Sequence, residues 1–320
     1  MAIGTICLAP LRGVTGLRFR QAFQAHHTGL DLAVAPFIAT VQGDKVKPEI
    51  LRGIEPSVQP EGLPLIPQVI GKDPRQLRVM LLAMMELGYR QVDLNAGCPW
   101  PFVAKKGRGS GLLRDETVLA NLLEVGCETL GEGNFSIKVR LGLEDNTLLA
   151  KRLPLIMRFP LREVCVHPRT ARQMYEGSVD LDAFEAIAQV CTLPLTYNGD
   201  IRTLADYQRL AARFPMVNRW MLGRGIVANP FLAESIRTGK DTREMIRFQA
   251  WHADLVARYA DGAPGDHALL GHLKELWSYL APTFMHGDKL WNSLKITRTR
   301  EEFERVLQLM PLRWKDAPQA

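Results

Sequence analysis

The sequence of 320 residues has no long apolar run, since no stretch approaches the ~18 residues of a membrane span. Its start, Met1 to Pro10, lacks a basic segment followed by an extended apolar one. We therefore expect no signal peptide and no membrane association. The sequence also has no low-complexity tract and no internal repeat beyond an alternation of strand-like and helix-like segments.

The sequence contains few cysteines, and their spacing does not suggest pairs. The five cysteines are Cys7, Cys98, Cys127, Cys165 and Cys191, an odd number with no CxxC spacing. The histidines outside the strand-like segments also lack metal-ligand spacing. These absences argue against a disulfide framework and a zinc site, and they favour a reducing compartment. We expect a cytoplasmic protein without a metal.

The fraction of charged residues is ordinary, and basic residues outnumber acidic ones. Charged residues make up 23% of the chain and the net charge is +6, with an isoelectric point of about 9.1. This balance permits a nucleic-acid partner without establishing one.

What the sequence does have is a regular alternation of short apolar runs and helical patterns. Short apolar runs are typical of parallel strands buried on both faces. The eight predicted strands are Thr5–Pro10, Asp31–Pro36, Leu65–Ile70, Gln91–Asn95, Phe135–Arg140, Glu163–His167, Leu193–Asn198 and Asn218–Leu222. Helical patterns lie between them at Pro74–Leu87, Thr117–Thr129, Thr147–Arg158, Asp182–Val190 and Leu204–Ala212. This is the α/β pattern of a TIM (β/α)8 barrel.

The strands stop near residue 236, which predicts two domains: a barrel at 1–236 and a helical domain at 241–320. The expected helices of the second domain are Thr242–Tyr259, His267–Leu280, Leu290–Leu294 and Arg300–Leu309. Trp251 and Trp277 fall at helical spacing, which is more typical of core residues than of a base-stacking surface.

A TIM barrel carries its chemistry at the carboxyl ends of its strands. Seven of the eight predicted ends carry polar, glycine or reactive residues. These are Pro10-Leu11-Arg12, Gln68, Asn95 to Cys98, Lys138 with Arg140, His167, Asn198-Gly199-Asp200 and Gly223-Arg224-Gly225. The remaining end, Pro36-Phe37, is aromatic. The joint pattern predicts an active site at this face.

Cys98 is the most informative of these residues. It stands between Gly97 and Pro99, so it cannot lie inside a helix or in the middle of a strand. Cys98 therefore occupies a turn just past the end of the fourth strand, close to Asn95. Two interpretations stay open from the residues alone: a reactive thiol, or a buried structural one, since free cysteine is among the most buried residue types.

Two further features indicate anion binding. The loops after strands seven and eight of TIM barrels commonly bind phosphate, and here they hold glycines and Arg224. The segment Pro99–Arg114 contains Lys105, Lys106 and Arg108 and no acidic residue. This segment is interpreted either as a solvated flexible loop or as a mobile basic lid that contacts a polyanion.

As a set, the strand-end motifs resemble the tRNA-dihydrouridine synthase family of flavoproteins. The segments that carry this resemblance are Leu8–Thr15, Gln68–Pro74, Asp93–Pro99, Gly109–Asp115, Lys138–Gly142, Val166–Thr170, Asn198–Ile201 and Leu222–Gly225, and the region around Lys274, Trp277 and Tyr279 also looks similar.

The resemblance implies an FMN-binding TIM barrel that uses NADPH to reduce a uridine in RNA, with tRNA as the expected substrate. We also expect a monomer. The resemblance further implies that Cys98 protonates uracil C5 after hydride reaches C6, and that Asn95 holds the uracil. Flavin contacts are implied for Gln68, Lys138 and His167 and for the backbone of Pro10, Leu11 and Arg12, and phosphate contacts for Asn198, Gly199, Asp200, Gly223 and Arg224. We place Arg140, Lys105, Lys106 and Arg108 on the substrate side.

The chain departs from the family pattern at three places. Pro101 stands where the family usually has a lysine, Pro36-Phe37 where it has a glutamate, and Pro168 where it has a glycine. These departures leave the identity of the RNA target open. Two other functions also stay open: a flavin barrel acting on a small pyrimidine, and an RNA-binding homologue that has lost catalysis.

Overall fold

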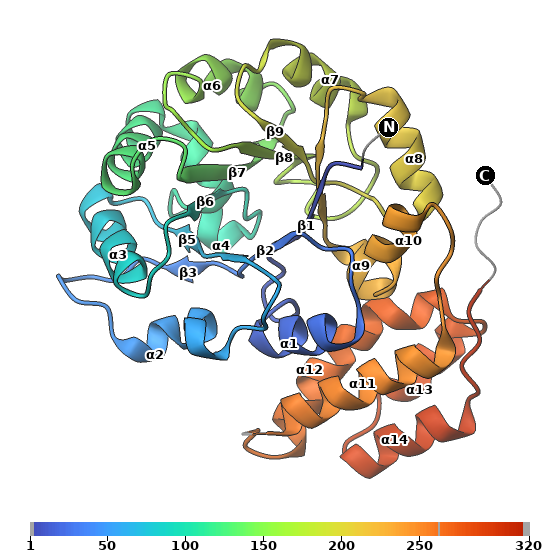
Figure 1. The fold of residues 1–320 in the computed structure, drawn as a ribbon. Helices are drawn as coiled ribbons and strands as arrows, with labels where there is room; N and C mark the ends of the chain where they lie inside the picture. The colour runs from blue at the N-terminus through green and yellow to red at the C-terminus, as the bar shows by residue number, and fades with distance from the viewer. Residues whose placement is uncertain (1–2, 262, 316–320) are drawn as a thin grey trace.

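The computed structural model describes residues 3–261 and 263–315, and its first part is a barrel of parallel strands surrounded by helices (Figure 1). Every strand pairing is parallel, and neighbours in the sheet run in the order β3-β5-β6-β7-β8-β9-β10-β1-β2-β4. The strands are β1 (Thr5–Leu8), β2 (Leu32–Val34), β3 (Ile38–Ala39), β4 (Leu65–Ile66), β5 (Gln68–Ile70), β6 (Val92–Ala96), β7 (Phe135–Gly142), β8 (Val164–Thr170), β9 (Leu195–Tyr197) and β10 (Arg219–Leu222).

The barrel closes at Pro67. The sequence predicts one strand over Leu65–Ile70, but Pro67 divides it into β4, which pairs with β2, and β5, which pairs with β6. Because β4 and β5 are consecutive in the chain, the two ends of the sheet meet and complete the ring. β3 is a two-residue strand that pairs with β5 and was not predicted from the sequence.

Helices follow the strands, and several of them begin at a capping side chain. Asp73 and Asp180 each accept a hydrogen bond from a backbone N–H of the first turn that follows, and Thr203 forms a reciprocal capping box with Asp206. The larger barrel helices are α1 (Leu17–His26), α3 (Pro74–Glu86), α5 (Glu116–Leu130), α6 (Leu148–Ile156), α7 (Leu181–Val190), α8 (Leu204–Arg213) and α10 (Leu232–Thr238). Shorter segments are α2 (Pro48–Leu51), η1 (Arg52–Ile54), η2 (Pro56–Val58), α4 (Pro101–Ala104), η3 (Gly109–Arg114) and α9 (Arg224–Ala228).

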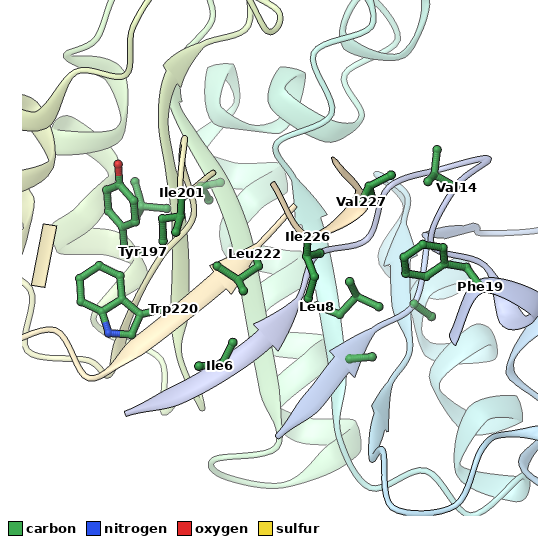
Figure 2. Packing of buried hydrophobic residues seen from close by; sticks show 14 of the residues in the cluster. Ile6, Leu8, Val14, Phe19, Tyr197, Ile201, Trp220, Leu222, Ile226 and Val227 are labelled. Carbon is green, nitrogen blue, oxygen red and sulfur yellow. The ribbon is translucent and has the colours of Figure 1, made fainter. Parts of the chain in front are cut away.

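The alternation of side chains along β1 shows how the core is divided. Ile6 and Leu8 belong to the large apolar layer between strands and helices, in which Leu222 and Phe19 also lie (Figure 2). Cys7 and Ala9, two residues later, belong to a separate small cluster, whose other members are Val34, Ile66, Cys165 and Met221. This second cluster fills the interior of the barrel, below its carboxyl end.

A helical domain packs against α1. It consists of α11 (Met245–Ala260), α12 (Asp266–Leu280), η4 (Ala281–Thr283), α13 (Gly287–Leu294) and α14 (Arg300–Leu309). Phe19 of α1 meets Trp251 of α11 edge to face, with ring centroids 6.1 Å apart. Trp251 and Trp277 are fully buried, which confirms that they are core residues. In the described part of the chain, no helix combines the length and the apolar character that a membrane crossing needs.

Candidate active site

The carboxyl ends of the strands open onto one pocket, and most of the predicted site residues line it. Those in the pocket wall are Pro10, Leu11, Arg12, Asn95, Cys98, Lys138, Arg140, His167, Asn198, Gly199, Asp200, Gly223 and Arg224. Residues from six different strand ends therefore converge, as the barrel geometry requires. Gln68, Lys105, Lys106 and Arg108 are absent from the wall.

A chain of hydrogen bonds fixes the turn that carries Cys98. The Asn95 Oδ1 accepts from the backbone N–H of Cys98 at 2.8 Å and from that of Gly97 at 3.2 Å. The Asn95 Nδ2 donates to Gln68 Oε1 at 2.8 Å, and Gln68 Nε2 donates to Asp93 at 2.7 Å. The buried carboxylate of Asp93 therefore orients Gln68, which orients Asn95. Gln68 is fully buried beneath Asn95, so its amide supports the wall from behind.

Cys98 is held from the other side by η3. The Cys98 carbonyl accepts a hydrogen bond from Ser110 N at 3.1 Å, and a Cβ on Gly109 would lie 2.8 Å from the Cys98 Cβ. Gly109 has a φ of +56°, so both its conformation and its close contact require glycine. The residues Gly109–Leu113 are buried. Gly109 and Gly111 of this basic segment serve close packing, and neither a solvated loop nor a mobile lid describes its second half.

The thiol of Cys98 is protonated at neutral pH. Only 7% of the residue is exposed, and this burial raises its pKa, opposed by a backbone hydrogen bond at Trp100 and by the charges of Arg140, Arg12 and Lys138. The result is a neutral S–H in a positively charged wall, which is a suitable state for a proton donor.

Lys138 and His167 give the pocket two further donors. Burial lowers the pKa of Lys138 and holds the pKa of His167 well below its usual value, helped there by Arg140 and Lys138. His167 is therefore neutral. Its Nε2 lies 3.1 Å from Arg169 Nη1, and because a guanidinium can only donate, the ring proton is on Nδ1.

Arg140 bridges two loops. Its Nε donates to the Gly97 carbonyl at 3.1 Å, and its Nη1 donates to the carbonyls of Thr170 at 2.8 Å and Met174 at 2.6 Å. Its guanidinium also lies over the Tyr175 ring, 5.2 Å from the centroid. Arg140 thus ties the Cys98 turn to the loop after β8 while keeping a positive charge in the wall.

Arginines gather at the end of the pocket formed by the loops after β9 and β10. Asp200 accepts from Arg224 Nη2 at 2.9 Å and from Arg169, and Arg202 lies 3.9 Å away. Burial opposes ionisation of Asp200, yet the bond to Arg169 and the nearby arginine charges hold its pKa below the usual value. Three guanidiniums against one carboxylate leave a net positive charge, which suits a phosphate. The Asp200 side chain orients these arginines.

The pocket wall also contains residues that were not predicted as site residues, among them Phe37, Trp100, Tyr175, Glu275 and Tyr279. Tyr175 lies between Arg140 and Arg224, with the Arg224 guanidinium 5.1 Å from its ring centroid. Glu275 and Tyr279 come from α12, so the helical domain completes the pocket. Phe37, one of the departures from the family pattern, packs under the Arg12 guanidinium at 5.6 Å.

Lys105 and Lys106 are exposed at the end of α4, outside the pocket, and Arg108 is half-buried. Within residues 3–261 and 263–315, no three histidine, cysteine or acidic side chains come together as a metal site.

The family model for dihydrouridine synthase matches residues 7–288. The chain belongs to the dihydrouridine synthase family. It is 26% identical to the tRNA-dihydrouridine(16) synthase of Shewanella oneidensis, over 95% of this chain and 97% of that protein. It is 28% identical to the tRNA-dihydrouridine(16) synthase of Cupriavidus necator, over 95% and 96%. The sequence-based identification of the family and of an oxidoreductase is confirmed.

Solved structures of low identity share the fold of this dihydrouridine synthase family member. An old yellow enzyme homologue from Zymomonas mobilis aligns with a TM-score of 0.55 at 12% identity, over 78% of this chain and 94% of that one. Morphinone reductase aligns with a TM-score of 0.54 at 15% identity, over 75% and 87%. The predicted α/β barrel is confirmed.

Proposed function

We propose that this protein reduces a uridine of tRNA to 5,6-dihydrouridine, with FMN as its bound flavin and NADPH as reductant. The observation that carries the proposal is the Cys98 turn: a neutral thiol in the wall of a positively charged pocket, held by Asn95 and Gly109. The two relatives that match 95% of the chain are named for position 16 of tRNA, so we propose that uridine as the target.

The donors of the pocket suit a flavin nucleotide. A flavin has ring carbonyls and nitrogens at one end and, in FMN, a phosphate at the other. Lys138 and the Nδ1–H of His167 would hold the ring, with Lys138 favouring negative charge on it. The phosphate would bind near Arg224, where Gly199 and Gly223 line the pocket without a Cβ. A flavin held there would supply the hydride for C6 of the uracil.

The chain's own residues then complete the reduction. Hydride addition at C6 places negative charge on the uracil, which the cationic wall of Lys138 and Arg140 stabilises. The Cys98 thiol gives its proton to C5, so that C5 and C6 each gain one hydrogen, and the resulting thiolate is reprotonated from solvent. Asn95 keeps the thiol in position through the backbone N–H of Cys98.

We propose that the helical domain binds RNA, since α12 supplies Glu275 and Tyr279 to the pocket wall. A tRNA substrate would place the enzyme in the cytoplasm. That it acts as a monomer stays a prediction.

Mapping dihydrouridine in cellular tRNA, with and without this protein, tests the target. We expect loss of dihydrouridine at position 16 alone, restored by the wild-type chain. The purified protein should be yellow and should lose its flavin absorbance when NADPH is added without oxygen. A protein that takes up no FMN contradicts the proposal, as does one that reduces free uracil as readily as tRNA.

A further inference from the structure

Trp100 is a large apolar side chain that is exposed to solvent in the wall of the pocket. It lines the pocket wall and is 60% exposed, whereas every other tryptophan in the described part of the chain is buried or half-buried. Phe102, two residues later, is 73% exposed. An exposed aromatic ring in the wall of an active site indicates a surface that a partner covers.

The backbone beneath Trp100 is rigid. Pro99 and Pro101 flank it, and its own φ of −54° and ψ of 125° are those of a polyproline segment. Its carbonyl accepts hydrogen bonds from Val103 N and Ala104 N, each at 2.9 Å, which begins α4. An indole on such a base loses little freedom when a partner packs on it, because the main chain is already ordered.

The charges around the two rings favour a nucleic acid. Lys106 Nζ lies 4.0 Å from the centroid of the Phe102 ring, and Lys105 is exposed beside it. The sequence from Pro99 to Arg114 contains no acidic residue. Flat aromatic surfaces combined with cations form the usual site for single-stranded nucleic acid, in which bases stack and phosphates meet lysines. A protein that covered Trp100 would make no use of its place in the wall of the proposed uridine pocket, so we favour RNA as the partner.

We propose that Trp100 stacks on the nucleotide next to the target uridine. This inference rests on the proposed function, because a uridine must leave its own base stack to enter the pocket. Trp100 lies two residues after Cys98 in the sequence and lines the same pocket. It would therefore replace the stacking partner that the neighbouring base loses, and Lys105 and Lys106 would meet the backbone phosphates that follow. Trp100 is then a residue that positions the RNA.

The test compares Trp100→Leu with Trp100→Phe in the full-length, FMN-loaded protein, with an unmodified tRNA transcript as substrate. Leucine keeps an apolar side chain without a ring, and phenylalanine keeps a ring. Stacking on one base corresponds to a change of about 5- to 150-fold in affinity. We expect Trp100→Leu to raise the KM and Kd for tRNA within that range with little change in kcat, and Trp100→Phe to stay within a few-fold of wild type.

Two readouts separate this role from a structural one. The rate of flavin reduction by NADPH, which needs no RNA, should be unchanged in both variants. Met216→Ala serves as the control, since Met216 is 60% exposed and precedes β10 at the opposite end of the barrel. It should leave every parameter unchanged. Because Trp100 is the most exposed indole, adding tRNA should also quench tryptophan fluorescence more in the wild type than in Trp100→Phe.

The outcomes are distinct. If the wild type forms dihydrouridine in tRNA but Trp100→Leu keeps wild-type KM and Kd, the stacking role is overturned and the proposed function stands. If the wild type neither binds nor reduces tRNA, both are overturned. If Trp100→Leu fails to fold, the fluorescence comparison decides, and equal quenching in wild type and Trp100→Phe overturns the role.

Discussion

Cys98 and Asn95 have separate tasks within one turn. Both hydrogen-bonding ends of the Asn95 amide are engaged, with Oδ1 on the turn and Nδ2 on Gln68, whereas the Cys98 thiol stands in the pocket wall. Removal of the thiol should therefore affect chemistry without loosening the turn.

We expect Cys98→Ala to bind FMN and tRNA normally and to slow the reoxidation of reduced flavin by tRNA by about 10²–10⁴-fold, as for a lost general acid. Stopped-flow measurement of flavin absorbance checks this. Cys127→Ala, a change at a half-buried thiol on α5, is the matched control and should behave as wild type. Wild-type rates in Cys98→Ala would contradict the proton-donor role.

Asp93 links protonation to stability. Burial raises its pKa to about 6, opposed by hydrogen bonds from Ser136 and Gln68. Between about pH 4 and 6 the folded protein thus binds more protons here than the unfolded chain, whose aspartate pKa is about 3.9. Stability contributed by this group is greatest below pH 4 and falls as the pH rises through 6, by roughly 3 kcal/mol.

Asp93→Asn cannot ionise, so this fall should vanish. We expect the difference in free energy of unfolding between wild type and Asp93→Asn to shift by roughly 3 kcal/mol from pH 4 to pH 7. Urea titrations at several pH values measure it. Parallel curves for the two proteins would show that Asp93 does not titrate in this range.

At the scale of elements, η3 shows why a glycine pattern misleads. Three glycines among basic residues predict flexibility, yet Gly109 and Gly111 pack where a Cβ would lie 2.8 Å from the Cys98 Cβ and 2.3 Å from the Ala104 carbonyl oxygen, respectively. A sequence shows the missing Cβ but not the neighbour that requires its absence.

Gly109→Ala should combine backbone strain with this clash. Gly133→Ala is the matched control: Gly133 has a φ of +72° but no atom within 4 Å of the added Cβ, and it precedes β7 at the other end of the barrel. We expect Gly133→Ala to cost about 1–2 kcal/mol of stability and to keep full activity. Gly109→Ala should cost more and lower kcat by displacing Cys98. Thermal unfolding and tRNA reduction measure both, and equal effects would refute the contact.

The same contrast explains what the sequence could and could not predict. Most strands were predictable because each contains a short apolar run followed by a polar residue, as at Asn95 and His167, although β8 continues past His167 to Thr170. The split at Pro67 depends on which neighbours β4 and β5 pair with, and the place of Gln68 behind Asn95 depends on the pairing of β5 with β6. Glu275 and Tyr279 reach the pocket through the packing of α12, which no local pattern records.

For the whole molecule, the net charge of +6 matters through its distribution. Lys105 and Lys106 are exposed close in sequence to the pocket, with no acidic residue between Pro99 and Arg114. If both meet RNA phosphates, each contributes about 0.7–0.9 to the slope of log K against log salt.

The double variant Lys105→Ala/Lys106→Ala should bind tRNA more weakly and flatten that slope by about 1.5, with unchanged flavin content. Lys151→Ala/Lys240→Ala removes the same charge from α6 and from the segment after α10, and should leave the slope as it was. Filter-binding titrations from low to high salt measure it. An identical slope in all three proteins would direct the search for the RNA footprint to the helical domain.

The contribution of α12 to the pocket ties the site to the order in which the chain is made. A ribosome delivers β1 first, yet β1 pairs with β10, and the wall that Glu275 and Tyr279 supply emerges later still. Domains generally fold as units during synthesis, so the nascent pocket lacks one side of its wall until α12 is released. An unfinished chain, surrounded by the tRNA that translation uses, therefore has no complete pocket in which to hold it.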